Sequence, residues 1–145
     1  MTLHPGERLV VDASVAVKWV VPEIGSDRAE LLLDHTLVAP DLLFTECANV
    51  LWKKLRRGEL TEEEAGIAAR TLEQVDLTVV PTKGYFARAL AIASELDHPA
   101  YDGIYLAVAE AFGLRLVTAD NRLIGKARQL PERFGHLLAA LTEIT

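Results

Sequence analysis

Four acidic side chains lie within largely apolar stretches, and they are the residues of this sequence best suited to chemistry. Asp12 directly follows the apolar run LVV, and Asp120 comes two residues after LVT. Glu46 lies within LLFTECANVLW, and Asp102 lies within AYDGIYLAVA. A carboxylate in apolar surroundings costs free energy unless it is solvated, paired or bound to a cation. The elements that carry these side chains decide which of these conditions applies.

Each carboxylate also has a simpler interpretation when it is taken alone. Asp12 and Asp120 each follow an expected strand, where an acidic residue commonly caps the next helix. Glu46 can pair with a buried arginine, and Asp102 can favour the N-terminus of its own helix. Four such residues, two of them expected at one rim, favour a further interpretation. Carboxylates brought close together repel one another, so that their pKa values rise or a cation joins them.

The types of the neighbouring residues indicate which cation that would be. Oxygen ligands alone select hard ions such as Mg²⁺, with Mn²⁺ a second possibility. We expect neither sulfur nor imidazole to take part. The only cysteine, Cys47, is expected to behave as a small hydrophobe. The four histidines show no metal-ligand spacing, and His98, which precedes Pro99, is interpreted as a turn residue.

The elements that position the acids are short β-branched runs alternating with longer stretches of helical spacing. Strands are expected at 9–11, 37–39, 77–80 and 115–118. Helices are expected at 14–21, 26–35 with Ser26 as its N-cap, 41–57, from a capping box at Thr61 and Glu64 onward, 83–96, 100–113 and 121–129. The tail beyond Phe134 is ambiguous between helix and strand.

This alternation predicts an α/β fold, a three-layer sandwich around a central, mainly parallel sheet of four to five strands. In such folds, ligands bind beyond the carboxyl ends of the strands. Asp12 and Asp120 follow the first and fourth expected strands. They should therefore lie at the same edge of the sheet.

The chain has 145 residues, of which half are hydrophobic and a quarter charged, and we expect residues 1–145 to form one domain. Its net charge of −6 argues against a non-specific nucleic-acid coat, but allows an enzyme that meets nucleic acid through a local basic patch and a cation. The start MTLHPGER is unlike a secretory signal, and no apolar run approaches the roughly 20 residues that span a bilayer. We therefore expect a cytoplasmic protein with no membrane segment.

Four blocks of the sequence together resemble a PIN domain, most closely the VapC-like toxins of type II toxin–antitoxin pairs. The blocks are VVDASVAVKW, FTECANVLW, YDGIYLAVAE and LVTADNRL, in the order of the family and over nearly the whole chain. The resemblance implies a PIN-like fold and a Mg²⁺-dependent endoribonuclease that hydrolyses RNA phosphodiester bonds. It also implies a cognate antitoxin as a partner and a homodimer.

The resemblance further implies roles for individual residues. Ser14 and Thr118 match hydroxyl positions beside the first and last acids, and Asn49 matches a polar companion on the helix of the second. Asn121 stands where related proteins often have another Asp, and Gly103 stands where Ala is more usual, which predicts a looser helix. The residues that would act in catalysis and hold the metal are Asp12, Glu46, Asp102 and Asp120.

Basic residues near these acids are candidates for contacts with RNA phosphates. Arg122 and Lys126 lie just beyond Asp120, and Lys18 follows Asp12 within two helical turns. The densest basic run, KKLRRG from Lys53, either contacts RNA or is a solvated helix end that complements the helix dipole.

Other classes of protein also place an aspartate after the first strand. A receiver domain needs an adjacent acidic pair, which this chain lacks beside Asp12. A phosphatase of the haloacid-dehalogenase type needs a second Asp two residues after the first, where this chain has Ser14. Two alternatives stay open: a catalytically inactive PIN-like binding module and a structure-specific DNA nuclease.

Overall fold

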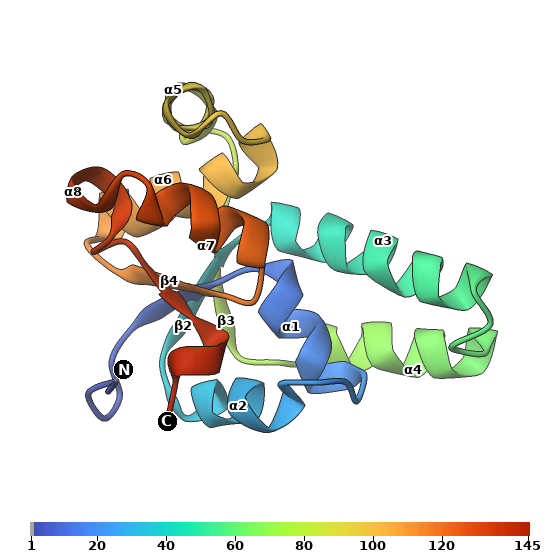
Figure 1. Ribbon diagram of the computed structural model, residues 1–145. Coiled ribbons are helices and arrows are strands. Elements are labelled where there is room, and N and C mark those ends of the chain that lie inside the picture. Colours follow the sequence, from blue (N-terminus) through green and yellow to red (C-terminus); the bar gives the residue numbers. More distant parts are fainter. Residues whose placement is uncertain (1) are drawn as a thin grey trace.

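The computed structural model describes residues 2–145, which form an α/β fold around one five-stranded sheet (Figure 1). Every neighbouring pair of strands is parallel, and the order across the sheet is β3-β2-β1-β4-β5. The expected mainly parallel sheet is therefore confirmed. The strands are β1 (Leu9–Val11), β2 (Leu37–Pro40), β3 (Leu77–Val80), β4 (Arg115–Thr118) and β5 (Leu138–Ala140).

Helices cover both faces of the sheet, as the sandwich prediction requires. In Figure 1, α5 to α8 lie above the sheet and α2 below it, while α3 and α4 extend together to one side. Helix α6 packs across β1, β2 and β4. The helices are α1 (Ala13–Val20), α2 (Ser26–Leu31), α3 (Leu42–Arg56), α4 (Glu62–Glu73), α5 (Phe86–Leu96), α6 (Ala100–Phe112), α7 (Asn121–Arg128) and α8 (Pro131–Phe134), with short 3₁₀ helices at Leu32–Asp34 and Leu141–Glu143.

The strand order reverses beside β1, and this reversal places the site. From β1 the chain adds β2 and β3 on one side, then returns to add β4 and β5 on the other. The C-terminal ends of β1 and β4 are adjacent, because Val11 pairs with Val117. In a sheet of this kind, the helices diverge to opposite faces at this point and leave a crevice beyond the strand ends.

The element boundaries depart from expectation in three places. Helix α5 begins at Phe86 rather than Lys83, because Thr82 and Tyr85 form a turn with Gly84 at a φ of 105°. The helix expected over 26–35 ends at Leu31 and continues as a 3₁₀ turn. Its N-cap is Gly25 rather than Ser26, whose hydroxyl instead accepts a hydrogen bond from the Glu23 amide. The ambiguous tail forms β5 and a 3₁₀ turn.

Other local predictions hold. The capping box of Thr61 and Glu64 is present in both directions, with hydrogen bonds of 3.1 and 2.9 Å. Helix α6 ends before Gly113, which adopts a left-handed conformation with a φ of 65°. Within residues 2–145, no helix combines the length and the apolar character needed to cross a membrane.

Gly103 has a packing role that the family pattern does not predict. A Cβ atom on Gly103 would lie 2.5 Å from the carbonyl oxygen of Ala89, on the neighbouring helix α5. The missing side chain therefore lets the two helix backbones approach closely. This contact fixes α5 against the helix that carries Asp102.

Candidate metal centre

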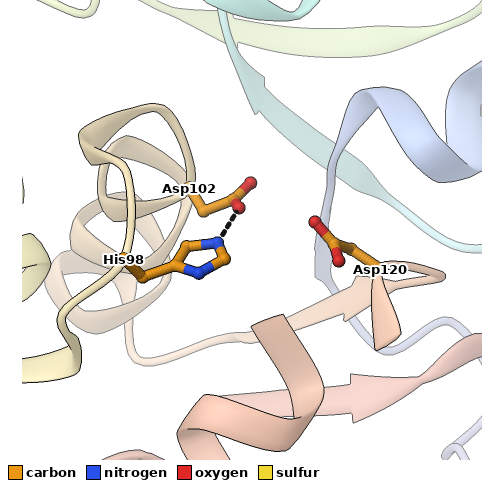
Figure 2. Close-up of side chains that lie close together, drawn as sticks. All are labelled: His98, Asp102 and Asp120. Atoms are coloured by element: carbon orange, nitrogen blue, oxygen red, sulfur yellow. Dashed lines mark hydrogen bonds and ion pairs between the residues drawn. The ribbon is translucent and has the colours of Figure 1, made fainter. Parts of the chain in front are cut away.

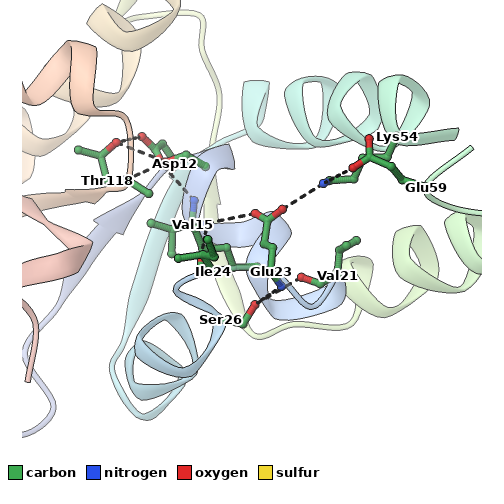
Figure 3. A network of polar contacts seen from close by, with 12 residues as sticks. Asp12, Val15, Val21, Glu23, Ile24, Ser26, Lys54, Glu59 and Thr118 are labelled. Carbon is green, nitrogen blue, oxygen red and sulfur yellow. Dashed lines mark hydrogen bonds and ion pairs between the residues drawn. The ribbon is translucent and has the colours of Figure 1, made fainter. Parts of the chain in front are cut away.

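Asp12 lies at the C-terminal end of β1, and only 3% of its surface is exposed. Its Oδ1 accepts hydrogen bonds from the Ser14 hydroxyl at 2.5 Å and from the Val15 amide at 3.3 Å, so it caps α1. Its Oδ2 accepts a hydrogen bond from the Thr118 hydroxyl at 2.5 Å (Figure 3). The capping interpretation of Asp12 is thus correct, but it describes only part of its surroundings.

Ser14 and Thr118 join the first and last acids into one network. Besides donating to Asp12, Ser14 accepts a hydrogen bond from the Ala119 amide at 2.9 Å. The Thr118 hydroxyl likewise accepts one from the Asp120 amide at 3.0 Å. Both hydroxyls therefore tie the end of β1 to the loop after β4. The structure places them beside the acids, as the sequence predicts.

Asp120 is both a helix cap and a member of the acidic group. Its Oδ1 accepts hydrogen bonds from the amides of Arg122 and Leu123, at 2.9 and 3.2 Å, at the N-terminus of α7. It is half-buried. The end of β4 places it across a gap from Asp102, which projects from the first turn of α6 (Figure 2).

The expectation that no histidine lies near the acids is wrong. Nε2 of His98 lies 2.5 Å from Oδ2 of Asp102, one helical turn further along the chain. His98, Asp102 and Asp120 can each offer one ligand atom such that these atoms all lie within 4.8 Å of one another (Figure 2). His98 lies in the turn before α6, so the helical rule that brings residues four apart to one face did not apply to this pair.

Glu46 is held by a tyrosine, not by the buried arginine that the simpler interpretation would require. The Tyr105 hydroxyl, from α6, donates a hydrogen bond of 2.6 Å to Oε1 of Glu46, on α3. Tyr105 is fully buried. Its polar tip gave no sequence signal, because its partner lies on a distant helix.

Burial is the main electrostatic influence on three of the four acids. It raises the pKa of Asp12 to about 7, although the hydrogen bonds from Ser14 and Thr118 act in the opposite direction. Burial also raises the pKa values of Glu46 and Asp102. The charge of Asp102 raises the pKa values of Asp12 and Glu46 further, which shows that the acids sense one another.

The donor set fits a divalent cation. Within residues 2–145, none of Asp12, Glu46 and Asp120 has a lysine or arginine at ion-pair distance. Asp102 and Asp120 belong to the tight group with His98, whereas Asp12 and Glu46 lie outside it. Buried or half-buried carboxylates that lie close together without a lysine or arginine are the surroundings that a hard cation stabilises.

The remaining candidates lie around this centre. Asn49 is exposed on α3, and Asn121 is exposed in the first turn of α7. Arg122 is exposed on α7, and Lys126 lies one turn further, 3.8 Å from Oδ2 of Asp97. Of the predicted RNA contacts, Arg122 and Lys126 therefore lie on α7, the helix that Asp120 caps.

Lys18 is engaged elsewhere. Its ammonium group lies 3.1 Å from Oε1 of Glu23 and donates to the carbonyl oxygen of Ile24 at 2.7 Å. Lys54 pairs with the other oxygen of Glu23, so that the two lysines share one carboxylate (Figure 3). This network joins α1, the loop before α2 and the end of α3.

Comparison with known sequences assigns the chain to a family. The PIN domain matches residues 9–129. Ribonuclease VapC3 of Pyrobaculum aerophilum is 38% identical over 138 residues, which cover 90% of this chain and 98% of that protein. Ribonuclease VapC9 of Mycobacterium tuberculosis is 36% identical over 115 residues, which cover 79% of this chain and 87% of that protein.

Solved structures support the same fold. PAE2754 from Pyrobaculum aerophilum superposes with a TM-score of 0.70 at 24% identity, covering 94% of this chain and 91% of that one. VapC20 of Mycobacterium tuberculosis, described as a toxin that cleaves the sarcin-ricin loop, has a TM-score of 0.62 at 14% identity, with 81% and 94% covered. With its acids gathered where β1 and β4 end, this chain belongs to the PIN domain family, in which its curated relatives are VapC ribonucleases.

Proposed function

We propose that this protein is a metal-dependent endoribonuclease, the toxin of a type II toxin–antitoxin pair. The observation that carries the proposal is that Asp102 and Asp120 lie together where the strand order reverses, with Asp12 and Glu46 near enough for the charge of Asp102 to raise their pKa values. The relatives with 36–38% identity are named ribonucleases, which supports RNA as the substrate.

The acids are proposed to hold Mg²⁺, with Mn²⁺ as a substitute. Asp102 and Asp120 supply ligand oxygens from α6 and α7, and Asp12 and Glu46 complete the set. When bound, a divalent cation lowers the pKa of a water molecule and polarises a phosphoryl oxygen of the substrate. Ser14 and Thr118 keep the Asp12 carboxylate in one orientation, since each hydroxyl donates to a different oxygen.

The basic residues on α7 are proposed to guide the RNA backbone. Arg122 and Lys126 are one helical turn apart, next to Asp120, and are well placed to contact phosphates that flank the cleaved bond. Lys18 is a weaker candidate, because Glu23 and the Ile24 carbonyl already engage its ammonium group. Asn49 and Asn121 are proposed as polar companions of Glu46 and Asp120.

We propose three further properties for the whole protein. An antitoxin partner is supported by a structural neighbour that is described as a toxin–antitoxin complex, from Klebsiella pneumoniae. A homodimer is supported by an exposed apolar face on α5 and α6, described below. A cytoplasmic location is supported by the single cysteine, which is buried and has no second cysteine with which to form a disulfide.

The decisive experiment is RNA cleavage by the purified protein with Mg²⁺, with EDTA, and with Asp12→Asn or Asp102→Asn. We expect cleavage that needs the cation and falls by at least about 100-fold in either variant, because each change removes a charged oxygen ligand. Undiminished cleavage by one variant would remove that residue from the site. If clean wild-type protein cuts no RNA, the result favours the catalytically inactive binding module. If it cuts structured DNA instead of RNA, the result favours the DNA nuclease.

A further inference from the structure

His98 occupies a tightly constrained turn between α5 and α6. Asp97, just before it, caps α5 in a left-handed conformation with a φ of 50°, and Pro99, just after it, is the N-cap of α6. Only 8% of the His98 surface is exposed. A non-glycine residue with a positive φ costs free energy, so this turn is held by its surroundings. The His98 ring is therefore presented to Asp102 from a fixed backbone.

The hydrogen bonds of the ring indicate where its proton lies. Nε2 is 2.5 Å from Oδ2 of Asp102, whereas Nδ1 is buried and has no hydrogen-bond partner among residues 2–145. A buried N–H without an acceptor is costly. The neutral tautomer that carries its proton on Nε2 avoids this cost, because Nε2–H donates to the carboxylate and Nδ1 carries no hydrogen.

The arrangement divides the two oxygens of Asp102 between two tasks. Oδ2 accepts the hydrogen bond from His98, and within residues 2–145 no hydrogen bond occupies Oδ1. Figure 2 shows Asp102 beside the His98 ring, with Asp120 across a gap from them. A carboxylate fixed through one oxygen presents the other in a defined direction. Hydrogen bonds that orient metal-binding carboxylates in this way strengthen metal binding.

We propose that His98 is a positioning residue: its Nε2–H holds Asp102 so that the carboxylate faces Asp120 across the metal centre. The proposal rests on the metal-dependent activity proposed above and adds a residue to that site. It makes His98 a hydrogen-bond donor to a ligand and not itself a ligand. The alternative, direct coordination through Nε2, would require the 2.5 Å contact with Asp102 to be broken.

Three substitutions separate a positioning role from mere packing. His98→Gln can place an amide N–H close to the position of Nε2, whereas His98→Asn, which is shorter, places its amide near Nδ1. His98→Leu fills the space with no donor. We expect Mn²⁺ affinity, measured by the electron paramagnetic resonance of free Mn²⁺, to fall about 10–100-fold in the Leu and Asn variants. The Gln variant should recover most of the wild-type affinity.

Two controls make the outcome decisive. Circular dichroism and thermal melting should show that the Gln and Asn variants fold like the wild type. Pulsed electron paramagnetic resonance of the Mn²⁺-loaded wild type should show no directly coordinated nitrogen. Equal affinity in all variants, equal loss in the Gln and Asn variants, or a strong nitrogen coupling would each overturn the positioning role. If the wild type itself binds no Mn²⁺, the proposed metal centre fails first, and this inference fails with it.

Discussion

At the scale of the residue, the acids of this protein perform two tasks at once. Asp12 and Asp120 each cap a helix and each contribute to the charged centre. The cap of α7 uses only Oδ1 of Asp120, and although both oxygens of Asp12 accept hydrogen bonds, a carboxylate oxygen has a second lone pair that a cation can use. The capping and metal-binding interpretations are therefore compatible, and the helix ends keep these carboxylates in place.

The raised pKa of Asp12 predicts how the stability of the metal-free protein depends on pH. Asp12 has a pKa of about 7 in the folded protein, against an ordinary value of 3.8. Between these values the unfolded chain has lost the proton that the folded protein keeps. The free energy of unfolding should therefore fall as the pH rises from about 4 to about 7, by up to a few kcal/mol. Urea denaturation in EDTA at about pH 5 and about pH 8 measures this decrease.

Asp12→Asn is the matched control for this pH dependence. The amide has a similar shape but does not titrate, so the decrease in stability should be clearly smaller in the variant. Carboxyls whose pKa is lowered, such as Glu7 and Glu23, destabilise the protein only at pH values below their ordinary 4.5 and lie outside this window. An equally steep decrease in the variant would contradict a raised Asp12 pKa as the cause.

Tyr105→Phe tests the hydrogen bond that holds Glu46. Loss of the hydroxyl removes a 2.6 Å hydrogen bond that lowers the pKa of Glu46, so that the pKa should rise further. We expect the free energy of unfolding at neutral pH to fall by about 1–2 kcal/mol, measured by urea denaturation. Tyr101→Phe is the control, since Tyr101 is exposed and should change stability little. An equal change in the free energy of unfolding of the two variants would show that the hydrogen bond to Glu46 does not stabilise the protein.

At the scale of the element, the contact between α5 and α6 fixes the position of the helix that carries Asp102. Gly103, which follows Asp102 in the sequence, lies against the backbone of Ala89. Gly103→Ala should lower the free energy of unfolding by about 1–3 kcal/mol, because the added methyl group meets a backbone oxygen that cannot move alone. Because the helices must separate, Mn²⁺ affinity should fall as well. Urea denaturation and Mn²⁺ titration measure the two effects.

Gly125→Ala is the matched control for this packing argument. Gly125 lies within α7, and a Cβ atom there would meet nothing within 4 Å. Alanine has a higher helix propensity than glycine, so the free energy of unfolding of this variant should be higher by up to about 1 kcal/mol. If both substitutions change the free energy of unfolding in the same direction, the close approach at Gly103 is not what sets the stability.

At the scale of the whole molecule, one apolar face supports the proposed homodimer. Phe86, Leu90 and Tyr101 line a groove of about 530 Å³ between α5 and α6, and each is about two-thirds exposed. Exposed apolar patches of this kind commonly mark interaction surfaces. Phe86→Glu with Leu90→Glu should therefore convert a dimer to a monomer in size-exclusion chromatography with light scattering.

Two exposed apolar residues elsewhere provide the control for the dimer. Ile24 and Ile67 lie outside this groove, so replacing both with Glu adds the same charge without touching the face. That control should remain a dimer. A monomeric wild type, or an equal effect of both pairs of substitutions, would remove the α5–α6 face from the proposal.

The sequence by itself determined the features that depend on neighbouring residues. Strands β1, β2, β3 and β4 and the capping box of α4 follow from β-branched runs and local cap chemistry. The shared edge of Asp12 and Asp120 follows from a general rule, because parallel strands end on the same side of a sheet. Glu46 and Asp102 are indicated by their apolar surroundings, and the family resemblance implies the metal-binding role of all four acids and the activity.

Only the tertiary structure decided the contacts between residues that are distant in sequence. The hydrogen bond from Tyr105 to Glu46, the linkage of Ser14 and Thr118 through Asp12, and the close approach at Gly103 each join separate elements. His98 is the instructive case, since it does lie in a turn, as the sequence predicts, but the sequence does not predict its contact with Asp102. Its burial and the direction of its ring are set by the packing of α5 against α6, and side-chain direction in a turn has no periodic signal.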